Sequence, residues 1–151
     1  AGTDLESRRL RREDAKRPDH RSGRLHMSAM IKPAPLLLVD DDPAVRTALK
    51  FALEIDGYVV ETYADAESLA ARRDMPLGGC MVVDYQLPGM NGLDLVETLR
   101  RRAVSLPALL ITTNPTRQVR RRAKEAGVNI VEKPLLSSSL SDAVARLLAG
   151  S

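Results

Sequence analysis

Residues 36–43 read LLLVDDDP, and this stretch decides the fold. Four consecutive large aliphatic residues are typical of a central parallel strand that is buried on both faces, because an exposed face would require alternating polar residues. The run ends at three aspartates, of which Asp42 suits the N-cap of a helix, while Pro43 suits the first turn. Apolar residues then recur at every fourth position from Val45 to Leu53. The stretch therefore predicts a buried strand followed at once by an amphipathic helix.

The same alternation of apolar runs and amphipathic stretches continues along the chain. Four more strands are expected at residues 58–63, 81–83, 109–111 and 128–131. A helical pattern follows each of them, and Asn114-Pro115 is expected to cap the fourth helix of the series. This pattern predicts an α/β fold in which right-handed crossovers bring the C-terminal ends of all five strands to one edge of a parallel sheet.

The N-terminal part of the chain differs in composition from the rest. Residues 1–26 hold eight of the 23 Lys and Arg residues and five of the 20 acidic residues, so they carry the whole formal net charge of +3. Their large aliphatic residues are too sparse to fix a helix on a core. We interpret residues 1–33 as a disordered basic leader, a remnant of cloning, or sequence upstream of a true start at Met27 or Met30. Residues 34–151 are expected to form one domain.

Cysteine content and hydropathy exclude several classes of protein. The single cysteine, Cys80, lies within an apolar run, so neither a disulfide framework nor a cysteine metal cage can be built. No apolar run approaches the roughly 20 residues that cross a bilayer, and the N-terminus has no hydrophobic signal core. We expect a cytoplasmic protein with no membrane association.

Polar side chains follow four of the expected strands at the point where each strand ends. They are Asp40 and Asp41, Asp84, Thr112 and Lys133. Three carboxylates brought together repel one another unless a cation intervenes, and a set of oxygen ligands suits Mg²⁺. A carboxylate beside Mg²⁺ is a competent nucleophile towards phosphorus, while a lysine and a hydroxyl can bind the transferred group. The pattern predicts a phosphoryl-transfer site.

Four motifs, in order and at the proper spacing, resemble the receiver domain of two-component response regulators, in particular its single-domain chemotaxis type. The motifs are LLVDDDP at residues 37–43, VVDYQLPGMNG at 82–92, IT at 111–112 and EKP at 132–134. The resemblance covers roughly residues 35–149. It implies a flavodoxin-like, doubly wound fold: a five-stranded parallel sheet in the order 2-1-3-4-5 with helices on both faces.

By that resemblance, Asp84 would be the phosphoacceptor. It would take a phosphoryl group from the phosphohistidine of a sensor histidine kinase or from a phosphotransfer protein. Asp40, Asp41 and Asp84 would bind Mg²⁺ together with the backbone carbonyl of Gln86. The chain would not be an enzyme in the ordinary sense, because it would catalyse only its own phosphorylation and dephosphorylation.

By the same resemblance, two further residues would bind the phosphoryl group. Thr112 would be the switch hydroxyl, and Lys133 would pair with the phosphoryl group and precede a cis peptide bond to Pro134. The output would be a conformational change that a downstream protein effector recognises, with no direct binding of nucleic acid if the chain is complete. The chain would be a monomer or a phosphorylation-dependent dimer.

Three positions depart from the pattern of the family. Ile130 stands where family members commonly have an aromatic residue on the last strand. Thr113 is bulkier than the small residue that often follows the switch hydroxyl. Gln86 is placed to orient or obstruct a hydrolytic water. We expect these departures to affect switching and the lifetime of the phosphorylated state.

Other functions remain open on the residues alone. A haloacid-dehalogenase-like phosphatase would use Asp40 as nucleophile, but it would leave Asp84 unexplained and lacks a second acidic pair after Lys133. A pseudo-receiver would bind a partner without being phosphorylated, and a DNA-binding regulator would need a further domain. The fourth helical stretch, residues 116–126, holds five basic residues, which indicates a solvated face or, as a secondary hypothesis, a site for an acidic partner.

Overall fold

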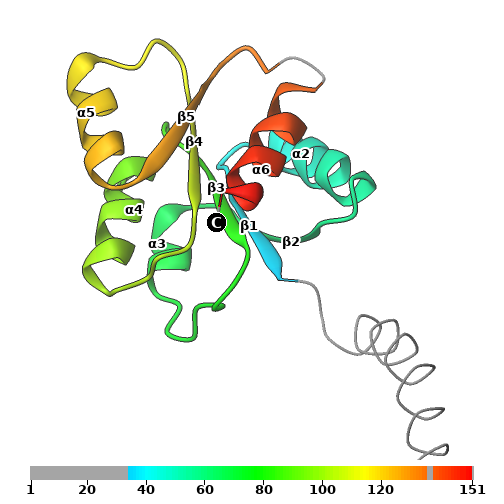
Figure 1. Ribbon diagram of the computed structural model, residues 1–151, viewed down its shortest axis with the longest axis horizontal. Helices are drawn as coiled ribbons and strands as arrows, with labels where there is room; N and C mark the ends of the chain where they lie inside the picture. Colours follow the sequence, from blue (N-terminus) through cyan, green and yellow to red (C-terminus); the bar gives the residue numbers. More distant parts are fainter. Residues whose placement is uncertain (1–33, 136–137, 151) are drawn as a thin grey trace, which may run out of the picture. The chain divides into compact units, whose positions relative to one another are not determined.

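The structure is a computed structural model that describes residues 34–135 and 138–150, so the predicted leader lies outside the described residues. Five parallel strands form one sheet in the order β2-β1-β3-β4-β5 (Figure 1). This finding confirms the predicted α/β class and strand order. The strands are β1 (Pro35–Val39), β2 (Val59–Tyr63), β3 (Cys80–Asp84), β4 (Ala108–Thr112) and β5 (Val128–Glu132).

Helices cover both faces of the sheet. They are α2 (Pro43–Ile55), α3 (Ala66–Ala70), α4 (Gly92–Arg101), α5 (Arg117–Glu125) and α6 (Ser139–Ala149). Helices α2 and α6 pack on one face, and α3, α4 and α5 pack on the other (Figure 1). Within the described ranges, each helix is too short or too polar to cross a bilayer.

Strand β1 is buried on both faces, which explains its uninterrupted apolar run. Leu36 and Leu38 join the core beneath α2 and α6, whereas Leu37 and Val39 join the core beneath α3, α4 and α5. Successive side chains of a strand point to opposite faces, so both sides of β1 must be apolar when both are covered. All four side chains are at most 1% exposed.

Helix α2 begins as its sequence predicts. Asp42 is the N-cap, and its Oδ1 accepts hydrogen bonds from the backbone N–H groups of Ala44 and Val45, at 2.9 and 3.3 Å. These bonds satisfy two donors that the first turn of a helix leaves without a partner inside the helix. The chain therefore turns from β1 into α2 immediately after the aspartates.

The expected cap of α5 at Asn114-Pro115 is wrong. Thr116 is the N-cap, and its hydroxyl accepts a hydrogen bond from the N–H of Val119 at 3.1 Å. Asn114 instead has φ +45°, in the left-handed region that asparagine tolerates better than most residues. The chain turns at Asn114, and the helix starts two residues later than expected.

Gly92, the first residue of α4, packs directly against the end of β3. A Cβ atom at this position would lie 2.3 Å from the carbonyl oxygen of Asp84 and 2.8 Å from Cγ1 of Val83. Both distances are shorter than any ordinary contact, so α4 can lie this close to β3 only because residue 92 has no side chain. The same glycine donates its N–H to the carbonyl oxygen of Tyr85 at 3.0 Å.

We predict that Gly92→Ala destabilises the fold, because the methyl group must displace backbone at the end of β3. The expected loss is roughly 2 kcal/mol or more in the free energy of unfolding, measured by urea denaturation. Gly78→Ala is the matched control, since its Cβ would meet only the side chain of Ala34 at an ordinary 3.5 Å. Equal effects of the two substitutions would contradict the packing described for Gly92.

Cys80 provides a second test of the fold. Its side chain is 1% exposed at the start of β3, and burial raises the pKa of the thiol to about 11. Below that pKa the thiol stays protonated and is a poor nucleophile. We predict no reaction of the folded protein with a thiol reagent at pH 8 and complete reaction in guanidinium chloride, followed by absorbance. Rapid reaction of the folded chain would show that β3 is not buried as described.

Candidate functional site

Three carboxylates meet at the C-terminal edge of the sheet. Asp84 ends β3, and Asp40 and Asp41 follow β1, which pairs with β3 in the register Val39 to Val83. The three side chains offer carboxylate oxygens that all lie within 4.8 Å of one another. The register of two adjacent parallel strands thus brings together residues that are more than 40 positions apart in the sequence.

Asp40 is held in place by two hydrogen bonds to backbone groups, one at its side chain and one at its own N–H. Its side chain is only 2% exposed, and its Oδ1 accepts the N–H of Asp42 at 2.9 Å. Its own N–H donates to the carbonyl oxygen of Tyr63 at 3.1 Å. Burial is the largest influence on the pKa of Asp40 and raises it, and the negative charges of Asp84 and Asp41 raise it further. The hydrogen bond from Asp42 and the positive charge of Lys133 lower it, but the net shift is upward. The carboxyl group therefore lies in an electrostatic environment that a further cation would relieve.

Asp84 contacts the lysine that follows β5. The Nζ atom of Lys133 lies 3.2 Å from Oδ2 of Asp84, whose side chain is 6% exposed. The other oxygen, Oδ1, accepts the backbone N–H of Gln86 at 3.1 Å. Lys133 is itself positioned by a hydrogen bond from its N–H to the carbonyl oxygen of Thr112 at 2.8 Å, and its peptide bond to Pro134 is cis, as the resemblance implied.

Thr112 and Gln86 lie beside this pair. Thr112 is the last residue of β4 and is 2% exposed. The register pairs Asp84 with Ile111, so Thr112 extends one residue beyond Asp84 on the neighbouring strand. Gln86 has an exposed side chain, and its backbone reaches Asp84 through the N–H group. The role of its carbonyl as a metal ligand stays a prediction.

A hollow of about 380 Å³ adjoins the carboxylates. It is formed by Asp41 and by the loop that follows β3, and its lining residues are Asp41, Tyr85, Gln86, Leu87, Pro88 and Asn91. The hollow gives a small ligand room to reach the exposed member of the carboxylate cluster.

The donor set fits a hard divalent cation. The three carboxylates are oxygen ligands, two of them buried and one exposed, which leaves positions for water or a phosphoryl oxygen. Both histidines of the chain lie within residues 1–33, and Cys80 is buried at the opposite end of β3. The site therefore suits Mg²⁺ better than zinc.

Two residues that support the site were not predicted from the sequence. Arg46, on the first turn of α2, donates from Nη1 to the backbone carbonyl of Asp40 at 2.8 Å. Glu67, on α3, accepts the N–H of Met90 at 2.9 Å and so fixes the loop after Asp84. The first contact is local enough that helical spacing could have indicated it. The second joins residues 23 positions apart and has no local signal.

The basic helix α5 is partly neutralised by neighbouring acids. Arg122 lies 2.9 Å from Oδ1 of Asp94 and 2.5 Å from Oε1 of Glu97, both on α4. Arg120 lies 2.9 Å from Oε1 of Glu132. The predicted solvated face is present: the side chains of Arg117, Arg121 and Lys124 are exposed, and so is that of Arg120.

A family model and several known proteins match the chain. The model described as the response regulator receiver domain matches residues 36–145. The C4-dicarboxylate transport transcriptional regulatory protein DctD of Pseudomonas aeruginosa is 35% identical over 114 residues, which are 75% of this chain and 25% of that protein. The two-component response regulator PhoP of the same species is 34% identical over 114 residues, covering 75% of this chain and 51% of that protein.

A third relative is the transcriptional regulatory protein FixJ of Rhizobium meliloti, 30% identical over 110 residues, which are 72% of this chain and 54% of that protein. The chain thus spans between a quarter and about half of the length of these relatives. Among solved structures, the response regulator StyR has a TM-score of 0.68 at 34% identity, covering 78% of this chain and 60% of that one. FixJ-N has a TM-score of 0.68 at 25% identity, covering 80% and 98%.

We predict that Mg²⁺ stabilises the protein and that Asp41→Asn removes most of this effect. Wild type should gain roughly 1.4 kcal/mol when the Mg²⁺ concentration is about ten times its dissociation constant. Without Mg²⁺, Asp41→Asn should be slightly more stable than wild type, because it relieves repulsion towards Asp40 and Asp84. Thermal unfolding with and without Mg²⁺ measures both effects.

Asp74→Asn is the matched control for this prediction. Its side chain is 95% exposed in the loop between α3 and β3, outside the carboxylate cluster. It should retain the wild-type response to Mg²⁺. An unchanged response of Asp41→Asn would show that this carboxylate is not a ligand.

Proposed function

The chain belongs to the response regulator receiver domain family, and from that premise we propose that it accepts a phosphoryl group on the carboxylate of Asp84 and acts as a phosphorylation switch. The observation that carries the proposal is the environment of this carboxylate. Asp84 is buried, contacts the Lys133 amine at 3.2 Å, and lies within 4.8 Å of two further carboxylates. A buried acid with one lysine and an excess of negative charge is arranged to receive both a divalent cation and a phosphoryl group.

The proposed cofactor is Mg²⁺, held by Asp40, Asp41, Asp84 and the backbone carbonyl of Gln86. When bound, it screens the negative charges that otherwise keep a carboxylate and a phosphoryl donor apart. The protein contributes the fixed positions of the oxygen atoms. Asp40 is oriented by the N–H of Asp42, and Asp84 by the N–H of Gln86.

In the proposed reaction, an oxygen of Asp84 attacks the phosphorus of a phosphohistidine. A P–O bond to the carboxylate forms as the P–N bond breaks, and the imidazole leaves with the electron pair of that bond and takes up a proton. Lys133 then pairs with a phosphoryl oxygen, and the Thr112 hydroxyl donates to another. Lys133 would then leave the Asp84 carboxylate and bind the phosphoryl group. Because Lys133 follows β5 and Thr112 ends β4, phosphorylation would change the contacts at the C-terminal ends of both strands.

Asp84 is a better candidate nucleophile than Asp40, which a phosphatase of the haloacid-dehalogenase type would use. Each of the two carboxylates accepts one backbone N–H, from Asp42 and from Gln86 respectively, so these bonds do not distinguish them. Asp84 has the cationic partner that a transferred phosphoryl group needs. This difference supports the switch over the phosphatase.

The proposed partners are a sensor histidine kinase or phosphotransfer protein, which supplies the phosphoryl group, and a downstream protein effector. The location that we propose is the cytoplasm, where Cys80 would remain reduced. DctD and FixJ are described as transcriptional regulatory proteins, but this chain spans only a quarter to about half of their lengths. We therefore do not extend direct DNA binding to it.

The proposal predicts a phosphoryl adduct on one residue. Incubation with Mg²⁺ and acetyl phosphate should add roughly 80 Da to the wild-type mass, and this adduct should be absent from Asp84→Asn. Asp40→Asn should form it more slowly, because that substitution weakens Mg²⁺ binding. Asp142→Asn, an exposed position on α6, is the control and should behave as wild type. Intact-protein mass spectrometry over time gives the readout.

Two results would contradict this assignment. An adduct that persists in Asp84→Asn and disappears in Asp40→Asn would favour the phosphatase. No adduct on the folded wild-type chain with either acetyl phosphate or a phosphorylated histidine donor would favour a pseudo-receiver, which binds its partner without phosphorylation.

A further inference from the structure

A second hollow, of about 690 Å³, lies at the edge of the sheet opposite the carboxylates. It is lined by Pro107, which precedes β4, and by Asn129, near the start of β5. The C-terminal ends of α4, α5 and α6 complete its wall, through residues that include Arg100, Ala126 and Leu147. Pockets for small molecules typically measure about 300–1,000 Å³. This cavity, which we name the arginine hollow after the two arginines in its wall, is therefore large enough for a small organic molecule.

The first of these arginines is fixed at the wall of the hollow by neutral partners. Arg100 donates from Nε to the carbonyl oxygen of Ala126 at 2.9 Å and from Nη1 to that of Val104 at 2.8 Å. Both acceptor residues line the hollow, so the guanidinium lies at its wall. The side chain is partly buried, and burial lowers the pKa of Arg100. Among the described residues no carboxylate offsets this effect, so an anion in the hollow would stabilise the charge.

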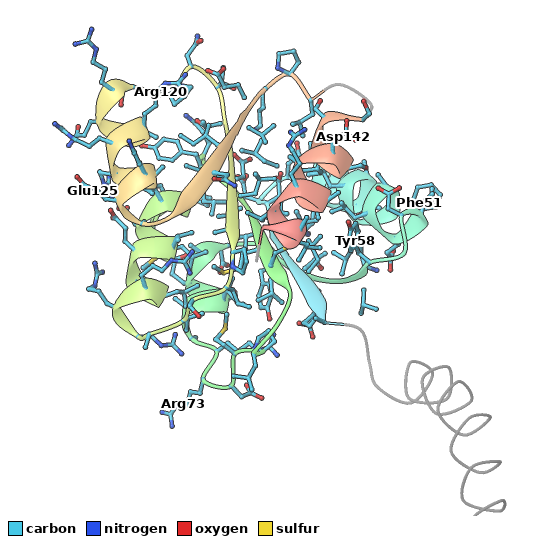
Figure 2. All side chains as sticks on the ribbon, viewed as in Figure 1. Phe51, Tyr58, Arg73, Arg120, Glu125 and Asp142 are labelled. Atoms are coloured by element: carbon cyan, nitrogen blue, oxygen red, sulfur yellow. The ribbon has the colours of Figure 1, made fainter. Side chains whose placement is uncertain are left out.

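The second arginine lines the hollow from α6, and acidic residues are missing around it. Arg146 is exposed and has no acidic partner within the described ranges. None of the described residues in the wall is acidic. Of the acids close in sequence, Glu97 pairs with Arg122. Figure 2 shows Glu125 on the outer side of α5 and Asp142 near the start of α6. The hollow therefore carries an excess of positive charge.

The backbone carbonyl groups at these helix ends would repel an anion if they were free, but several are already bound. Those of Ala126 and Val104 accept from Arg100, as described above. The carbonyl oxygen of Arg146 accepts the N–H of Gly150 at 3.1 Å. These bonds reduce the negative potential that the C-terminal ends of helices otherwise produce.

We propose that the arginine hollow binds a small organic phosphate, whose phosphate group pairs with Arg100 and Arg146. The planar fork of a guanidinium matches the oxygen atoms of a phosphate group. Two arginines match the double charge of a phosphate monoester better than the single charge of a carboxylate. The volume exceeds that of a phosphate group alone, and Val104, Pro107 and Leu147 offer apolar contacts to an organic part.

Nuclear magnetic resonance of the full ¹⁵N-labelled chain tests this proposal with phenyl phosphate, a phosphate monoester with one apolar group. Measurements without Mg²⁺ make the result independent of phosphoryl transfer. Binding in the millimolar range should shift the amide signals of Gly127 and Asn129 and the Nε–H signal of Arg100. The amide signals of Asp42 and Gln86, which contact the carboxylates, should not move.

Two analogues identify the group that is recognised. Benzyl alcohol, which has the ring but no charge, should bind at least about tenfold more weakly than phenyl phosphate, because it cannot form charge-assisted hydrogen bonds. Benzoate has the ring and a single negative charge. It should bind more weakly than phenyl phosphate at about pH 8, where the phosphate monoester carries two charges.

Substitutions at Arg146 test the pairing without disturbing the core, because this side chain is exposed. Arg146→Ala should weaken the binding of phenyl phosphate by about tenfold, whereas Arg146→Lys should retain part of it, since the charge remains without the fork. Arg121→Ala is the matched control. It removes an exposed arginine of α5 that lies outside the hollow, and it should bind as wild type does. Circular dichroism verifies that each variant is folded.

Four results would overturn the proposal. They are unchanged signals of the hollow at about 20 mM phenyl phosphate, and an Arg146→Ala variant that binds as tightly as wild type. The others are benzyl alcohol that binds as tightly as phenyl phosphate, and benzoate that binds more tightly than phenyl phosphate. The last result would assign the hollow to carboxylates instead.

Discussion

The repulsion among three clustered carboxylates, with one lysine set against it, is the constraint on which the rest of the molecule depends. Asp40 and Asp84 are withdrawn from water, so their charges are poorly screened, and Lys133 offsets only part of the excess. The five-stranded sheet supplies this arrangement, because β1, β3, β4 and β5 each end at one edge with a polar group. A different strand order would separate the lysine from the acids.

Packing around the sheet keeps these strand ends in place. Gly92 lets α4 approach the backbone of Asp84, and Glu67 holds the loop that follows it from the side of α3. On the opposite face, Arg46 of α2 binds the carbonyl of Asp40. The site is thus supported from both layers of helices, by α2 at the backbone of Asp40 and by α3 and α4 at Asp84 and the loop that follows it.

The basic surface of α5 and the apolar surface of α2 lie on opposite faces of the sheet. Helix α5 is basic but partly neutralised by Asp94, Glu97 and Glu132, whereas α2 carries apolar residues where charge is expected. The α2 surface begins directly after the aspartates of the site, since Asp42 is the N-cap of that helix.

The sequence by itself determined the α/β class, the strands and the residues at their ends, because the uninterrupted apolar run of β1 and the abrupt change to Asp40 are local signals. The motifs also indicated the strand order and the cis bond before Pro134 through resemblance. Only the tertiary structure decided that Thr116, not Asn114, caps α5, since backbone conformation at Asn114 depends on how the chain leaves β4. It also decided the contact of Glu67 with Met90 and the exposure of Phe51. Contacts between distant segments and the covering of a helix face depend on how elements pack, and no local pattern of residues encodes that.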